Sequence, residues 1–237
     1  SITAYYDVNP YLADEPENRM EEFHKLVERT HAAGLKVIID FVPNHVARDY
    51  GRFAAAHPAP TGMAALGESD DKSVHWKDSN DFFYYPGIPL ALPIQNQTYM
   101  EMPAMASGNS YTSSPGVNDW YDTIKLNYCD THTETWEKMY DIVNFWAGQG
   151  VDGFRCDMVE LVPPAFFKWL ISRIKKDRPD LLFVAEVYQK TLYSKYIREI
   201  DFDLLYDKSG IYDTLRAIVE KNAKDSGVPV EDWQCRQ

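Results

Sequence analysis

The chain has 237 residues, enough for one large domain or two small ones. With 45% hydrophobic and 25% charged residues, its composition is typical of a soluble globular protein. No run of about 18 apolar residues occurs, so no transmembrane helix is predicted. The net charge of −12 argues against nucleic acid as a partner, because its phosphates require a basic surface. A neutral substrate is compatible with this charge.

The cysteines and aromatic residues exclude fewer classes of protein. Cys129, Cys156 and Cys235 are too few and too irregularly spaced for a disulfide framework or a zinc site. We interpret them as small buried hydrophobic residues. Aromatic residues make up 14% of the chain. This content fits a sugar-binding cleft and a large aromatic core equally, and composition does not decide between them.

Helical patterns alternate with apolar runs along most of the chain. The run LKVIIDF (35–41) is β-branched and continuously apolar, as in a parallel strand covered on both faces. Four such strands alternating with helices indicate an α/β fold with a parallel sheet, either doubly wound or closed into a barrel. No glycine-rich phosphate loop follows a strand, which argues against nucleotide binding. The predicted elements are, in chain order, helix 17–33, strand 35–41, helix 133–147, strand 151–158, a helix bounded by Pro163 and Pro179, strand 181–188, strand 201–207 and helix 211–223.

One connection interrupts this alternation. Residues 46–131 separate strand 35–41 from helix 133–147 and are far longer than an ordinary loop between a strand and a helix. The segment is rich in Pro, Gly and aromatic residues, including FFYYPG at residues 82–87. We expect a connection of this length to fold as a small inserted subdomain.

Each predicted strand ends in an acidic residue. Asp40, Asp157 and Glu186 end the first three strands, and Asp203 or Asp207 ends the fourth. The carboxyl ends of parallel strands lie at one edge of a sheet, and that edge carries the active site in barrels and in open sheets alike. We therefore expect these acids to be neighbours.

The segment GFRCD (153–157) places a basic and an acidic side chain on one face of its strand. Arg155 and Asp157 point the same way, while Phe154 and Cys156 point toward the covering helices. The charge of Arg155 would keep Asp157 ionised, and the apolar setting of Glu186 would raise its pKa and keep it protonated. Glycoside hydrolysis requires such a pair of carboxyl groups. One pair alone would more often be a structural ion pair, but three acids at one edge favour catalysis.

These segments resemble signatures of the α-amylase family of glycoside hydrolases, family 13. DFVPNH (40–45), GFRCD (153–157) and VAEVY (184–188) are similar to three signatures of that family, in the same order and at matching spacing. IKLNY (124–128) stands where the family carries a short motif near the end of its inserted domain. The resemblance implies a TIM (β/α)8 barrel, represented here by roughly units two or three to six, with a long inserted subdomain after barrel strand three. The catalytic barrel portion would be residues 1–45 and 132–237, and the inserted subdomain residues 46–131.

The resemblance also implies roles for individual residues. Asp157 would be the nucleophile of a retaining mechanism and Glu186 the general acid/base, with their carboxyl groups about 5–5.5 Å apart. Arg155 would orient Asp157. His45 would hydrogen-bond the sugar at the subsite where cleavage occurs.

Calcium is the one cofactor that the resemblance raises. Asp40 and Asn44 would support the loop after barrel strand three, a region that helps to organise a calcium ion in many family members. Asn44 is the candidate ligand, although Asp and Asn are also common turn residues. Lys125 stands where many calcium-binding members carry an acid, and a lysine would repel the ion. The sequence therefore leaves a calcium site open without predicting one.

Two departures from the family pattern concern the cleft and the extent of the chain. MVEL (158–161) follows Asp157 where many α-amylases continue with Lys-His, so the leaving-group side of the cleft should differ from theirs. The fourth signature, with the Asp of strand seven, is absent, since no NHD occurs. A half-barrel would leave strand edges unpaired. We therefore expect a piece of a longer protein, in which the lack of a signal peptide at residue 1 does not indicate the cellular compartment.

Together these features predict a retaining hydrolase of α-glucosidic bonds in starch-type polysaccharides or maltooligosaccharides. A transglycosylase of the same fold would pass the sugar to another sugar instead of water, and the sequence does not separate the two. A carbohydrate-binding relative without catalysis is disfavoured by Asp157 and Glu186, yet the missing seventh-strand Asp keeps it open. The expected partner is an α-glucan or an oligosaccharide, with no nucleic acid and no membrane span.

Overall fold

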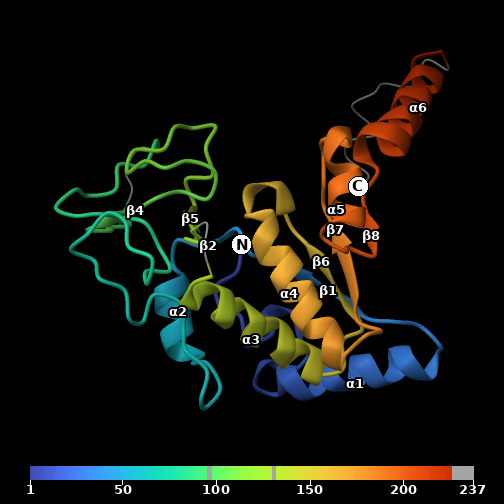
Figure 1. Ribbon diagram of the computed structural model, residues 1–237, viewed down its shortest axis with the longest axis horizontal. Coiled ribbons are helices and arrows are strands. Elements are labelled where there is room, and N and C mark those ends of the chain that lie inside the picture. The colour runs from blue at the N-terminus through green and yellow to red at the C-terminus, as the bar shows by residue number, and fades with distance from the viewer. Residues whose placement is uncertain (95–97, 130–131, 226–237) are drawn as a thin grey trace.

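A parallel sheet of four strands forms the centre of the computed structural model, which describes residues 1–94, 98–129 and 132–225 (Figure 1). The strands β1 (Ile38–Phe41), β6 (Gly153–Cys156), β7 (Leu182–Ala185) and β8 (Leu204–Leu205) lie side by side in that order. Neighbouring strands run parallel, with Asp40 opposite Arg155. The order in the sheet follows the order along the chain, as it does in successive units of a barrel.

A helix precedes each strand of this sheet. The helices α1 (Arg19–Ala32), α3 (Glu134–Gly148), α4 (Pro164–Asp177) and α5 (Tyr193–Arg198) lead into β1, β6, β7 and β8, and α6 (Asp213–Asp225) follows β8. Gly34 and Gly150, at φ values of +75° and +94°, turn the chain between a helix and the next strand. The alternation predicted from the sequence is confirmed, with strands shorter than expected. No helix among the described residues is long and apolar enough to cross a bilayer.

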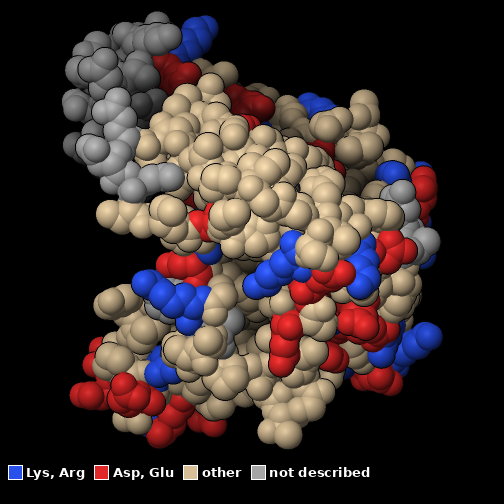
Figure 2. Space-filling view, turned by 90° about the vertical axis from the view of Figure 1, so that its left-hand side faces the viewer, with Lys and Arg blue, Asp and Glu red and all other residues tan. Residues whose placement is uncertain are grey.

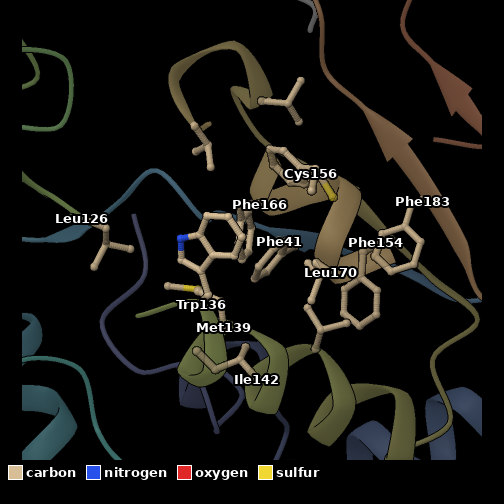
Figure 3. Close-up of a cluster of buried hydrophobic side chains, with 14 of the residues drawn as sticks. Phe41, Leu126, Trp136, Met139, Ile142, Phe154, Cys156, Phe166, Leu170 and Phe183 are labelled. Atoms are coloured by element: carbon tan, nitrogen blue, oxygen red, sulfur yellow. The ribbon is translucent and has the colours of Figure 1, made fainter. Parts of the chain in front are cut away.

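The core lies between the sheet and the helices α3 and α4, which pack side by side (Figure 1). Phe154 and Cys156 of β6 point toward these helices and are buried, as the alternation in GFRCD predicted. The rings of Phe154 and Phe183 stack with their centroids 6.0 Å apart. The helices fill the same space with large side chains, among them Trp136, Met139, Phe166 and Leu170 (Figure 3).

The other face of the sheet is not covered by the described chain. Ile38 and Leu204 lie on this face and are 43% and 54% exposed. The expectation that strand 35–41 is covered on both faces is therefore wrong for this chain. Among the described residues, the large buried side chains lie on the helix side of the sheet, and Ile38 and Leu204 on the other face contact solvent.

The segment between β1 and α3 contains only short elements and lies at the end of the molecule remote from α6 (Figure 1). β2 (His45–Ala47) pairs antiparallel with β5 (Thr123–Lys125), and β3 (Tyr84–Tyr85) pairs antiparallel with β4 (Ala104–Met105). α2 (Tyr50–Ala56) follows β2. The β2–β5 pair forms the base of the segment, where the chain leaves the parallel sheet and returns to it.

A buried carboxylate fastens this segment to α3. Asp81 is fully buried and accepts hydrogen bonds from Lys138 Nζ at 2.5 Å, from Thr135 Oγ1 at 2.7 Å and from the N–H of Gly67 at 2.7 Å. Lys138 and Thr135 both belong to α3. Every charge in this cluster has a partner, as burial requires.

A second buried pair lies inside the segment. Arg48 donates to Glu101 at 2.8 Å and to the Ser107 hydroxyl at 2.7 Å.

Figure 2 shows the face of the molecule that lies on the left-hand side of Figure 1. On this face, acidic and basic side chains are interspersed below a wide uncharged area. The net charge of −12 is therefore not gathered into a single acidic patch on this face.

Among the described cysteines, Cys156 fits the sequence interpretation of a small buried hydrophobic residue more closely than Cys129 does. Cys156 is buried in the core, and Cys129 is half-buried. Cys235 lies outside the described residues.

Candidate active site

The acids that end β1, β6 and β7 meet at one edge of the sheet, as the sequence predicted. Arg155 stands at their centre. Its Nη1 donates to Asp40 Oδ1 at 2.8 Å and to Asp157 Oδ1 at 2.6 Å, and its Nη2 lies 2.6 Å from Glu186 Oε1. One guanidinium group therefore binds three carboxylates from three adjacent strands.

The acids proposed for the end of the fourth strand do not join this cluster. Asp203 binds Lys175 and the N–H of Phe183, so it lies level with the middle of β7 and not with its end. Asp207 accepts from the N–H groups of the turn at Gly210 and Ile211. The sequence predicted three acids of the cluster correctly and the fourth incorrectly, because β8 comprises only Leu204–Leu205, so Asp203 precedes it and Asp207 lies in the turn after it.

Glu186 receives two hydrogen bonds in addition to its ion pair with Arg155. The Tyr188 hydroxyl donates to its Oε1 at 2.7 Å, and the N–H of Met158 donates to its Oε2 at 3.0 Å. Tyr188 was not among the predicted site residues. Its position two residues after Glu186, on the same face of an extended stretch, is the sequence signal that could have identified it.

These contacts shift the pKa values of the two acids in directions opposite to those predicted. Burial raises the pKa of Asp157, and the charge of Glu186 adds to this rise, so that the opposing effect of Arg155 is exceeded. Burial also acts to raise the pKa of Glu186, but the hydrogen bonds from Tyr188 and Met158 and the charge of Arg155 outweigh it, and that pKa is lowered. The predicted directions, a lowered pKa of Asp157 and a raised pKa of Glu186, are therefore wrong for this structure, because Arg155 is shared by both acids and Glu186 has two further donors.

Asp157 and Glu186 are neighbours at this edge, because both bind Arg155 and each carboxyl group affects the pKa of the other. A retaining pair keeps its carboxyl groups about 5–5.5 Å apart, and that separation stays a prediction for these two acids.

His45 opens β2 on another wall of the site. Burial lowers its pKa to about 4, so the ring is neutral at pH 7. The side chain of Asn44 orders the ring. Its Oδ1 accepts from Lys125, and its Nδ2 donates to the carbonyl of Gly108 at 2.7 Å and to His45 Nδ1 at 3.3 Å. Because Nδ1 of His45 accepts in this network, its proton is assigned to Nε2.

A cleft of about 310 Å³ connects these groups. Its lining includes side chains from the sheet edge and from the turn before β5, among them His45, Trp120, Asp122, Asp157, Glu186 and Tyr188. The ring centroid of Trp120 lies 5.2 Å from that of His45. Cavities of about 470 and 480 Å³ elsewhere contain none of the acids that bind Arg155. Chemistry, not size, therefore identifies the cleft as the candidate site.

The donor groups near Asn44 do not suit calcium. The oxygen of its side chain, the candidate metal ligand, is bound to the ammonium group of Lys125. In the part of the chain that the structure describes, no group of three or more His, Cys, Asp or Glu side chains could hold a metal ion. Calcium needs several oxygen ligands, usually with carboxylates among them.

Comparison with known proteins assigns the chain to a family. The family model described as the catalytic domain of alpha-amylase matches residues 2–204. Cyclomaltodextrin glucanotransferase of Bacillus licheniformis is 28% identical over 179 residues, which is 74% of this chain and 20% of that protein. Neopullulanase 2 of Thermoactinomyces vulgaris is 26% identical over 187 residues, which is 77% of this chain and 26% of that protein. The chain thus spans about a fifth to a quarter of the length of these curated relatives.

Solved structures show the same fold. The cyclic alpha-maltosyl-(1→6)-maltose hydrolase from Arthrobacter globiformis, in complex with maltose, has a TM-score of 0.53 at 20% identity, covering 86% of this chain and 39% of that one. An alpha-amylase from Lactobacillus plantarum has a TM-score of 0.53 at 22% identity, covering 96% of this chain and 46% of that one. The chain belongs to the α-amylase family, and its four parallel strands with their helices are part of a TIM barrel.

Proposed function

We propose that this chain carries the nucleophile and the general acid/base of a retaining glycosidase that cleaves α-glucosidic bonds in starch-type polysaccharides or maltooligosaccharides. The observation that carries the proposal is the binding of Asp157 and Glu186, from the ends of adjacent parallel strands, to the single guanidinium group of Arg155. The names of the relatives, a glucanotransferase and a neopullulanase, support α-glucans as the substrate class. We also propose that residues 46–131 are an inserted subdomain of the barrel formed by residues 1–45 and 132–237.

In this proposal the reaction proceeds in two steps. Asp157 attacks the anomeric carbon while Glu186 protonates the departing glycosidic oxygen. Water that is deprotonated by Glu186 then releases the sugar from Asp157. The pair needs one proton for its two carboxyl groups, and that proton must lie on Glu186 when the substrate is bound.

Substrate binding can place the proton there. A sugar that enters between the two acids separates Glu186 from Asp157 and from Arg155. If Arg155 remains with Asp157 and Asp40, its positive charge then favours ionised Asp157, and Glu186, which is buried and has lost that charge, becomes the better proton carrier. We thus propose Arg155 and Asp40 as the residues that orient the nucleophile.

His45 is proposed to bind the sugar at the cleavage subsite. Its ring is neutral near pH 7, and its assigned proton on Nε2 makes that nitrogen a donor. A neutral donor suits a sugar hydroxyl, which carries no charge. Trp120 beside the ring supplies an aromatic surface to the same cleft.

Transglycosylation is the second candidate, favoured by the glucanotransferase among the relatives. The two reactions share the glycosyl-enzyme and differ in the acceptor. Product analysis of the protein expressed from its complete reading frame, with and without an added acceptor sugar, separates them. Longer oligosaccharides at the expense of free reducing sugar would indicate transfer.

Azide rescue tests the two catalytic assignments. Glu186→Gln should form the glycosyl-enzyme from an α-glycosyl fluoride, because fluoride departs without acid, and azide attack on it should give the retained α-glycosyl azide. Asp157→Gly should give the inverted β-glycosyl azide by direct displacement. Both variants should lose at least about a thousandfold in turnover on maltooligosaccharides. A β-azide from Glu186→Gln, or a labelled sugar trapped on Asp207, would contradict the assignment.

A further inference from the structure

Lys125 is a buried lysine whose contacts are all uncharged. It is 6% exposed, and its Nζ binds the side-chain oxygen of Asn44 and the backbone carbonyl of Leu161, the latter at 3.1 Å. The same Nζ lies over the Tyr111 ring, 5.8 Å from its centroid. Among the residues that the structure describes, no Asp or Glu forms an ion pair with it. Lys138, by contrast, is equally buried and pairs with Asp81.

An ammonium group is costly to bury without a counter-charge. Here it faces two oxygen atoms that carry partial negative charge and the electron-rich face of an aromatic ring. An amide oxygen and a backbone carbonyl are also the uncharged oxygen ligands that calcium accepts in proteins. The environment of Lys125 Nζ is therefore that of a cation site in which the protein itself supplies the cation.

We propose that the ammonium group of Lys125 occupies the position of a metal cation at the base of the inserted segment, and that this position does not bind calcium. Two uncharged oxygens fall short of the six to eight oxygen ligands of calcium, and the fixed positive charge repels the ion. The chain thus departs from those members of its family that hold calcium in this region.

The same contacts make Lys125 a positioning residue for the cleft. It lies on β5 and joins the loop between β1 and β2, through Asn44, to the turn after Asp157, through Leu161. By holding Asn44 Oδ1, the ammonium group directs Asn44 Nδ2 toward His45 Nδ1. Nε2 of His45 is thereby left as the ring's donor. Lys125 acts on the cleft through these neighbours and does not line it.

Hydrogen exchange measured by mass spectrometry tests the proposal locally, in the protein expressed from its complete reading frame. The informative peptides cover residues 42–47, 123–127 and 159–163. EDTA and added calcium should leave their exchange unchanged in the natural protein. Lys125→Met keeps the length of the side chain and removes its charge, and it should speed their exchange by about tenfold. Lys176→Met makes the same chemical change at an exposed position of α4 and should have no effect on them.

A second variant tests whether the position is a cation site. Lys125→Asp replaces the repelling charge with a carboxylate near the Asn44 and Leu161 oxygens, and water can supply the remaining ligands of calcium. Exchange in these peptides should therefore be fast in EDTA and slow again in millimolar calcium. Lys125→Met should not respond to calcium. Faster exchange of these peptides in the natural protein on adding EDTA would overturn the proposal. So would an unchanged exchange in Lys125→Met, or an absent calcium response in Lys125→Asp.

Discussion

Two regions of the molecule hold charged side chains out of bulk water, and they do so differently. At the junction of α3 with the segment between β1 and α3, Asp81 has one basic partner, Lys138, and accepts from two further donors. At the strand ends, Asp40, Asp157 and Glu186 share a single Arg155. The first cluster has as many positive as negative charges, and the second has three acids to one base.

This difference in charge balance distinguishes a cluster that stabilises the fold from one that is suited to catalysis. A balanced pair leaves no choice of protonation, so its only effect is on stability. In an unbalanced cluster the carboxyl groups compete for one positive charge, so their pKa values are coupled and a small change in their surroundings shifts both. Perturbed acids of this kind are typical of catalytic sites. The predictions that follow test whether substitution lowers the melting temperature in the first cluster and raises it in the second.

Breaking the balanced cluster should give the largest loss of stability. Asp81→Ala leaves the Lys138 ammonium buried without a counter-charge, which costs about 3–5 kcal/mol. The melting temperature should fall by roughly 10 °C. Adding Lys138→Met should recover part of that loss, because it removes the unpaired charge.

The control for this pair is a pair on the surface of α1. Lys25 and Glu21 are 58% and 64% exposed and 2.6 Å apart, so Glu21→Ala should leave the melting temperature unchanged. Equal melting temperatures of Asp81→Ala and Glu21→Ala, by differential scanning calorimetry, would show that burial of the Asp81 pair contributes nothing.

Substitution in the unbalanced cluster should raise the melting temperature instead of lowering it. Asp157→Asn removes a carboxylate whose ionisation is resisted by burial and by Glu186, and the Asn amide can still donate to Glu186. The melting temperature at pH 7 should rise by about 2–5 °C, corresponding to roughly 0.5–2 kcal/mol. A fall in melting temperature at pH 7 would mean that Arg155 stabilises ionised Asp157 more than Glu186 opposes it.

The pH dependence of this effect follows from the sign of the pKa shift. The pKa of Asp157 is raised above its ordinary value of 3.8, so the folded chain binds this proton more tightly than the unfolded chain does. Stability is therefore lost as the pH rises from 3.8 through the raised pKa. The advantage of Asp157→Asn should be present above that pKa and vanish below pH 3.8, which melting curves across this range measure.

Tyr188 provides a test of the proton balance itself. Its hydroxyl donates to Glu186 and helps to lower the pKa of that acid. Tyr188→Phe should raise the pKa of Glu186, so the basic limb of the profile of kcat/KM against pH should move to higher pH. The maximal rate should fall about fivefold, as for one lost hydrogen bond to a charged group. Tyr11→Phe, at a 94% exposed position, is the control. An unshifted basic limb would exclude Tyr188 from the proton balance.

The sequence predicted those features that depend on local pattern. The alternation of helix 133–147 with strand 151–158 follows from spacing along the chain, and the meeting of Asp40, Asp157 and Glu186 follows from parallel strand ends. The contact of Lys125 with Asn44 could not be predicted in this way, because it joins positions 81 residues apart. β3 and β4, with two residues each, are too short to show any periodicity.

The predicted pKa directions of Asp157 and Glu186 were wrong for a different reason. The residue types at positions 155, 157 and 186 were identified correctly, and the prediction assumed that Arg155 served Asp157 alone. The balance depends on which oxygens the two guanidinium nitrogens face and on one backbone N–H, that of Met158. The orientation of these groups is set by the packing of whole strands and turns, which a single sequence does not display.

The smallest effect is expected at Glu160, which supports Tyr188 from the turn after Asp157. Its two carboxylate oxygens accept the backbone N–H groups of Tyr188 at 3.2 Å and of Gln189 at 3.0 Å. Glu160→Gln keeps one acceptor oxygen, so one of these two bonds is lost and the loop after β7 should loosen without collapsing. Because Tyr188 then holds Glu186 less firmly, kcat should fall about twofold to threefold. The basic limb of the profile of kcat/KM against pH should move in the same direction as in Tyr188→Phe, but by less.

In the double variant Glu160→Gln/Tyr188→Phe the two losses in kcat should not add, because both act through the hydroxyl of Tyr188. Additive losses in kcat would show that Glu160 affects the cleft by another route.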